Sequence, residues 1–223
     1  MMTNLFSIFD PSTSTSLALN WLTFAPPILL IPSMYWVCPS RFQFIWHSIF
    51  SYLLNEMKNI YQKKKKKFLS IFATIFWFIL MCNFLGLFPY IFTPTSHINL
   101  TSFMALPMWL TFMLYGWIHQ TNFMFSHLVP NGTPIPLSMF MVCIETISNL
   151  IRPLTLSVRL TANMISGHLL LCLLSNLMTT MPSMSVILLF PMLTLLTLEM
   201  AVAIIQSYVF ITLTSLYLNE LNN

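Results

Sequence analysis

Long apolar stretches separated by short polar connections dominate the chain and predict membrane-spanning helices. A helix needs about 20 residues to cross the hydrocarbon core, and on this measure we expect about five membrane helices. These spans are residues 17–37, 68–92, 98–118, 137–177 and 183–218. Helices are preferred to a β-barrel because the apolar runs are continuous, whereas barrel strands alternate at every second residue. The sequence therefore predicts an all-α polytopic protein with a single membrane domain over residues 1–223.

The last two apolar runs are longer than a membrane is thick. As full helices they would extend about 60 and 54 Å, against a hydrocarbon thickness of about 30 Å. Helix tilts average only about 20°, so either each run breaks or both helices lie strongly oblique. No proline falls within 154–177, and Pro191 is the only one in the last run. We therefore expect two long, strongly tilted helices joined as a hairpin around residues 179–182.

Residues 41–61 have the pattern of an amphipathic helix rather than a span. Apolar residues recur there at spacings of three and four, which places them on one helical face: Phe42, Ile45, Trp46, Ile49, Phe50, Leu53, Leu54 and Met57. This pattern predicts a helix in the membrane interface, with its aromatic face in the acyl boundary. Packing of the same face on protein stays open as an alternative.

Five consecutive lysines, Lys63–Lys67, follow this helix. Basic short loops mark the cytoplasm-equivalent side of a membrane, and each lysine could attract anionic lipid headgroups by about 1 kcal/mol. A nucleic-acid patch is disfavoured because the flanking apolar segments place the lysines against a bilayer. We expect no nucleic-acid partner.

Composition excludes a soluble domain and most catalytic classes. Of 223 residues, 57% are hydrophobic and 6% are charged, whereas soluble domains have about 25% charged residues. The four cysteines are isolated and indicate apolar packing. No phosphate loop, GxSxG motif or metal-spaced Cys/His set is present, so we expect no cofactor and no nucleotide hydrolysis by this chain. Residues 1–16 have no signal or transit pattern, which predicts insertion through the chain's own spans.

Arg159 is the most informative residue for function. It lies inside the run 137–177, and its guanidinium stays protonated at ordinary pH. A charge near the middle of a bilayer costs roughly 2.5–3.5 kcal/mol even on lenient scales, and its default interpretation is an ion or substrate pathway.

Helical phase divides the polar residues of this run between two faces. At 100° per residue, Glu145, Arg152, Arg159 and Asn163 fall within about 60° of one another, whereas His168 lies about 180° from Arg159. In the last run, Glu199 and Gln206 share a face. Two groups on different faces favour two separate partial access routes over one straight channel.

Several of these residues also have plainer interpretations. His168 could be a packing histidine bonded to a carbonyl, Glu145 could complement a helix dipole, and Glu220 near the end of the chain could be solvated. Glu199 is harder to dismiss, because a carboxyl deep in an apolar run must be protonated or paired.

The segment Ser157–Leu170 resembles the signature of the subunit a family of F-type ATP synthases, in its mitochondrial and arthropod-like form. Further pieces match in order and spacing: Asn83–Pro89, Phe92–Thr95, Pro130–Pro134, Ile144–Ser148, Leu198–Ala203 and Gln206–Phe210. The run of five lysines departs from the family, whose loop is basic but rarely of this composition.

The resemblance implies a proton-conducting stator beside a rotating c-ring, with other membrane-sector and peripheral-stalk subunits as partners. It implies that Arg159 faces the ring carboxylates. Residues beside the intermembrane-space half-channel would be Asn83, Asn163, His168, Glu199 and Gln206. Glu145 and Glu220 would belong to the matrix half-channel. The implied location is the mitochondrial inner membrane, with the N-terminus towards the intermembrane space and the lysines and C-terminus towards the matrix.

Two other classes of function stay open at this stage. A small secondary transporter could use Arg159 to bind an anion, but it would need discontinuous helices or repeated halves, and neither is visible. A structural subunit of a respiratory complex is disfavoured by the intramembrane Arg159 and Glu199.

Overall fold

The computed structural model describes residues 5–14, 16–30, 37–60, 69–129 and 134–220. All regular structure in these ranges is helical, which confirms the predicted all-α class. The longer helices are α2 (Arg41–Ile60), α3 (Leu69–Gly86), α4 (Ile98–His119), α6 (Ile135–Thr180) and α7 (Ser185–Glu220). The shorter ones are η1 (Leu5–Phe9), η2 (Leu19–Phe24), α1 (Ala25–Leu29), η4 (Pro94–Ser96), α5 (Thr121–His127) and η5 (Pro182–Met184).

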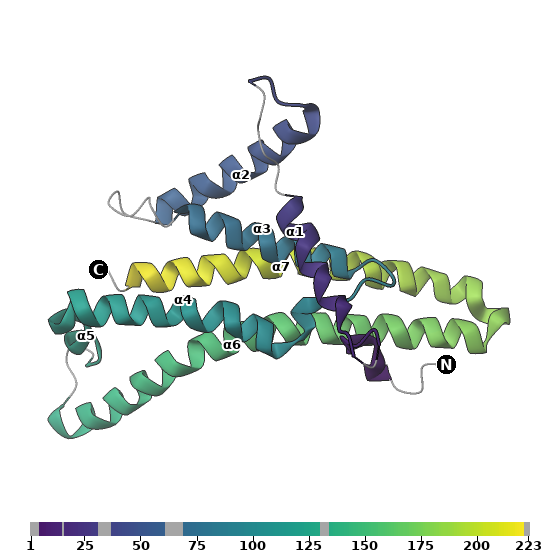
Figure 1. Cartoon of the computed structure of the whole chain (residues 1–223). Helices are drawn as coiled ribbons and strands as arrows, with labels where there is room; N and C mark the ends of the chain where they lie inside the picture. Colours follow the sequence, from purple (N-terminus) through teal and green to yellow (C-terminus); the bar gives the residue numbers. More distant parts are fainter. Residues whose placement is uncertain (1–4, 15, 31–36, 61–68, 130–133, 221–223) are drawn as a thin grey trace.

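Among the described residues, α3, α4, α6 and α7 are long and apolar enough to cross a membrane. Helices α6 and α7 form a hairpin through η5, α4 lies along α6, and α3 packs on α7 (Figure 1). Side chains from all four helices meet in one apolar core, whose centre includes Ile79, Leu160 and Phe210.

Both long apolar runs are single helices, as predicted. Helix α6 has 46 residues and continues through Pro153, and α7 has 36 residues and continues through Pro191. A membrane helix tolerates an internal proline because neighbouring helices and nearby hydroxyl groups satisfy the backbone groups that the proline leaves free. The hairpin keeps residues far apart in sequence side by side along most of its length (Figure 1).

Helix α2 leaves the bundle obliquely, and its apolar face has two environments (Figure 1). Towards its end, Leu53, Leu54 and Met57 pack on the core. Towards its start, Phe42 and Ile45 are exposed. The structure thus combines the two interpretations of this helix, since one part packs on protein and the other offers an apolar surface.

The region predicted as the first span contains η2 and the short helix α1. Trp77 on α3 anchors it by donating from Nε1 to the Pro27 carbonyl oxygen at 3.2 Å. Residues 31–36 of this predicted span and Lys63–Lys67 lie outside the described residues. The span over 17–37 therefore stays a prediction.

Candidate functional site in the seam between α6 and α7

Polar side chains face one another along the antiparallel seam between α6 and α7. Asn163 Nδ2 donates to Gln206 Oε1 at 3.2 Å. Further along α6, His168 Nε2 lies 4.0 Å from Glu199 Oε1. Later positions on α6 meet earlier positions on α7, as an antiparallel pair requires. The hairpin thus joins four of the predicted site residues into two cross-helix pairs.

The His168–Glu199 pair is largely buried, and no hydrogen bond joins its two side chains. The side chain of Glu199 is 4% exposed and that of His168 is 13% exposed. Their separation exceeds a hydrogen bond, and His168 Nε2 and both Glu199 carboxyl oxygens have no hydrogen-bond partner in the described chain. A buried polar group without a partner costs about 1–3 kcal/mol, and native proteins satisfy such groups with polar partners or water. The pair therefore places two titratable groups inside the apolar seam.

Gly167 allows the carboxylate of Glu199 to lie directly against α6. A Cβ atom at position 167 would overlap Glu199 Oε1 and would lie 2.7 Å from Glu199 Cδ. Beside it, Phe9 of η1 meets the His168 ring edge-on, with 6.4 Å between the ring centroids. The backbone of α6 at Gly167 and the ring of Phe9 thus border the space around the His168–Glu199 pair.

A second group of buried polar atoms lies where η4 packs on α3 and α6. Asn83 is fully buried, and neither its Nδ2 nor its Oδ1 has a hydrogen-bond partner in the described residues. The same holds for Thr95 Oγ1 and His97 Nε2. Gly86, one turn after Asn83, brings η4 close, because a Cβ at this position would lie 2.5 Å from Thr93 Cγ2.

Of these three residues, Asn83 was predicted from the sequence, whereas Thr95 and His97 were not. The His97 ring packs in a cluster with Trp21 and Phe92, at 5.4 Å from each ring centroid, and these two rings lie 5.7 Å from each other. Only the segment Phe92–Thr95 could have indicated them, through its family resemblance. Their burial depends on the folding back of η2 and η4, which no local pattern predicts.

Arg159 is exposed, in contrast to the two seam pairs. On a helix, Asn163 lies about 40° and His168 about 180° from Arg159, and both of them reach α7. Helix α7 therefore lies between these two directions, and Arg159 points away from the seam. No hydrogen bond or ion pair within the described residues holds its guanidinium. Charges in membrane helices almost always face a polar partner or a water-filled cavity.

The predicted stripe of Glu145, Arg152, Arg159 and Asn163 does not form one continuous line. Arg152 is half-buried, and its Cζ lies 5.1 Å from the ring centroid of Tyr217 on α7. Asn163 also turns to α7, while Arg159 is exposed. A long side chain at the border of the seam can turn either towards α7 or away from it. Helical phase alone does not determine which direction it takes.

The two remaining predicted residues are not joined to these pairs. Glu145 is half-buried near the start of α6, and the described contacts around it involve its backbone carbonyl, which accepts from Ser148 Oγ at 2.8 Å. Glu220 is the last residue of α7, and its side chain lies outside what the structure describes.

The fold and the seam define a polytopic membrane protein with titratable groups inside a long helical hairpin. Similar proteins show the family to which this chain belongs. The family described as ATP synthase A chain matches residues 14–219. Proteins named ATP synthase subunit a match over the full length of both chains: 57% identity over 227 residues in Drosophila melanogaster, 56% over 226 in Aedes aegypti and 56% over 229 in Anopheles gambiae. The chain belongs to the ATP synthase A chain family, which confirms the arthropod-like resemblance.

The close approach at Gly167 generates a structural prediction. Gly167→Ala places a methyl group where the Glu199 carboxylate lies, and overpacking of this kind costs about 1–3 kcal/mol. We expect α6 and α7 to separate locally. The measurement is the rate at which a short bifunctional thiol reagent joins Asn163→Cys to Gln206→Cys, after the four native cysteines are replaced by serine.

The matched control is Ser166→Ala, an exposed neighbour on α6 whose hydroxyl bonds only its own helix. Cross-linking should slow by about fivefold or more with Gly167→Ala, which corresponds to roughly 1 kcal/mol, and stay unchanged with Ser166→Ala. Equal rates in the two backgrounds would contradict the packing described here.

Proposed function

We propose that this chain is the proton-translocating stator subunit of a rotary F-type ATP synthase. It provides two offset half-channels, and Arg159 faces the carboxylates of a rotating c-ring. The observation that carries the proposal is an asymmetry within α6: His168 meets a buried carboxyl group in the seam, while Arg159 is exposed on the surface. The family membership supports the same conclusion.

The outward position of Arg159 suits contact with a moving partner. A carboxylate on a ring can face lipid only when it is protonated, because bare charge in hydrocarbon is prohibitive. Close to the fixed charge of Arg159 the ionised carboxylate is favoured instead, so each ring site releases its proton there. The same charge repels protons that would leak directly between the half-channels.

The seam and the adjoining buried polar atoms form the intermembrane-space half-channel in this proposal. Protons pass along Glu199 and His168, with Asn163, Gln206 and Asn83 as polar neighbours of the path. The unpartnered atoms of Glu199, His168 and Asn83 support this role, because such atoms bind water in a working protein. Thr95 and His97 extend the same polar region towards η2.

The matrix half-channel contains Glu145 and Glu220, at the start of α6 and the end of α7. These two ends lie on the same side of the molecule because α6 and α7 are antiparallel, and the start of α6 diverges from α7 there (Figure 1). The two routes are thus offset along the hairpin, and a ring must turn to carry a proton from one route to the other. A membrane potential of 100 mV supplies about 2.3 kcal/mol per proton for this rotation.

The same proposal specifies the membrane in which the chain lies and its partners. The chain lies in the mitochondrial inner membrane, with its N-terminus towards the intermembrane space and its C-terminus towards the matrix. Its partners are the c-ring and other membrane-sector and peripheral-stalk subunits, and Lys63–Lys67 on the matrix side attract lipid headgroups. Nucleotide binding and hydrolysis take place on other subunits of the complex.

The intact complex offers the test that separates this proposal from an anion transporter. When the purified complex is placed in vesicles with its nucleotide-binding sector outside, ATP hydrolysis should acidify the lumen. A carbodiimide that modifies the ring carboxylates should abolish the acidification. Purification of the chain without ATPase activity or a c-ring would instead support the transporter.

Replacement of Glu199 tests its place on the proton path. Glu199→Gln keeps the shape of the side chain but cannot exchange a proton, and loss of a positioned proton-transfer group typically lowers a rate by roughly 10²–10⁴-fold. We expect slowed proton flow in an assembled complex, measured as the rate of lumen acidification per assembled complex.

Glu56→Gln is the matched control. Glu56 is a carboxylate on α2 that accepts a hydrogen bond from the Tyr208 hydroxyl at 3.1 Å, and the proposed path does not include it. Its rate should stay unchanged. An unchanged rate for Glu199→Gln would remove Glu199 from the path.

A further inference from the structure

Arg152 marks one end of the polar seam between α6 and α7. Eleven residues separate it from Asn163 on α6, and eleven residues also separate their contacts on α7, Tyr217 and Gln206. The two contacts therefore keep one antiparallel register, about 16 Å apart at 1.5 Å per residue. A cation thus lies in the same seam as the proposed proton path.

The chemistry of the seam changes along this register. The titratable pair His168–Glu199 comes first, and the hydrogen-bonded amide pair follows it. The next stretch is apolar, and its residues are almost completely buried in the core. They are Leu156 and Leu160 on α6 and Phe210 on α7. These side chains have no group that could accept a proton and pass it on.

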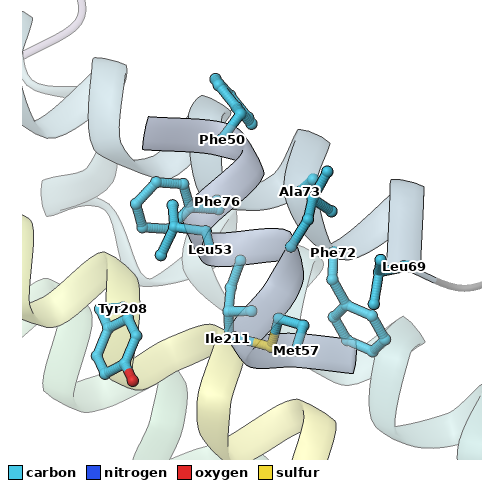
Figure 2. Close-up of a pocket in the computed structure, with 10 residues that line it drawn as sticks. Phe50, Leu53, Met57, Leu69, Phe72, Ala73, Phe76, Tyr208 and Ile211 are labelled. Carbon is cyan, nitrogen blue, oxygen red and sulfur yellow. The ribbon is translucent and has the colours of Figure 1, made fainter. Parts of the chain in front are cut away.

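The flank of α7 is also apolar at this level. There Ile211 lines a groove between α2, α3 and α7, together with Met57 and Phe72 (Figure 2). The residues that line this groove are apolar apart from Tyr208, whose hydroxyl donates to Glu56. The described lining of the groove therefore offers no continuous polar route around the apolar stretch of the seam.

Beyond the apolar stretch, the guanidinium of Arg152 lies over an aromatic ring. The side chain of Arg152 is half-buried, and its Cζ atom lies 5.1 Å from the ring centroid of the half-buried Tyr217. This distance is in the range of a cation–π interaction. A guanidinium keeps its proton at any ordinary pH, so this end of the seam has a permanent positive charge.

Arg152 separates the two groups of residues that the proposed function assigns to different half-channels. Glu145 lies seven residues earlier on α6, about 10 Å along the helix axis. Asn163 and the titratable pair lie in the other direction along the seam. The second arginine of α6, Arg159, is exposed and points away from the seam. The charge of Arg152 is therefore the one that lies between the two routes within the hairpin.

We propose that Arg152 closes the seam to protons, so that the intermembrane-space half-channel can discharge only to the ring. A proton that continued along the seam would leave its polar partners, cross buried apolar side chains and approach a fixed positive charge. Each of these changes raises the free energy of the proton. Tyr217 is the positioning residue that keeps the guanidinium at the end of the seam. The inference rests on the proposed function, and adds a barrier on a different face of α6 from Arg159.

The test measures proton conductance that does not depend on rotation. The intact complex is assembled with a ring whose carboxylates are replaced by amides and is placed in vesicles under an imposed pH gradient. Arg152→Gln should raise the conductance per complex about tenfold over that of the complex with Arg152. This factor corresponds to the repulsion between unit charges about 12 Å apart at an effective dielectric constant of about 20.

Matched variants separate the charge from the packing of the side chain. Arg152→Lys keeps the charge and should keep the conductance low. Tyr217→Phe keeps the ring face and should also keep it low, whereas Tyr217→Leu releases the guanidinium and should raise it. Arg41→Gln neutralises an exposed arginine on α2 and should change nothing.

Two results would overturn the inference. One is an unchanged conductance with Arg152→Gln in assembled complexes. The other is an equal rise with Arg152→Gln and Arg152→Lys, because packing rather than charge would then close the seam.

A parallel measurement separates this inference from the proposed function. The unsubstituted complex with its normal ring is tested for ATP-driven acidification of the vesicle lumen. If acidification is present, a negative result with Arg152→Gln contradicts the role of Arg152 alone. If it is absent, the proposed function fails and this inference fails with it.

Discussion

The structure depends on one constraint: a polar side chain in a membrane-spanning helix must find a polar partner. The hydrocarbon core of a bilayer contains no water that could act as this partner. The hairpin of α6 and α7 meets the requirement in part across its seam, where Asn163 bonds Gln206 and His168 lies 4.0 Å from Glu199 without a hydrogen bond. The two pairs occupy residues 163–168 of α6 and 199–206 of α7, a short part of helices that have 46 and 36 residues.

The same constraint gives α6 two different surfaces. On one side His168 faces the buried Glu199 of α7, whereas on the other side Arg159 is exposed and has no polar partner among the described residues. In our proposal this division separates the proton route from the rotor contact. Gly167 makes the inner side possible, because any larger residue there would displace the carboxylate.

Periodicity and run length predicted the helical class, the amphipathic helix and the two unbroken long helices. Each of these features depends on residues that are close together in the sequence of one helix. Helical phase also placed Glu199 and Gln206 on one face, and in the structure both residues meet α6. It could not assign Asn163 and Arg159 to different environments, since they differ by about 40° on the helix and only the position of α7 distinguishes them. Thr95 and His97 were missed for a similar reason: their burial comes from the packing of η4 on α3 and α6.

The central claim is that a fixed positive charge on the outer face of α6 couples proton flow to rotation. The most direct measurement compares ATP synthesis with passive proton conductance in vesicles that contain the complex with Arg159→Gln. The account predicts that synthesis is lost while the complex still assembles and protons leak without rotation, because nothing then separates the two half-channels. Sustained, proton-driven ATP synthesis in this variant would contradict it.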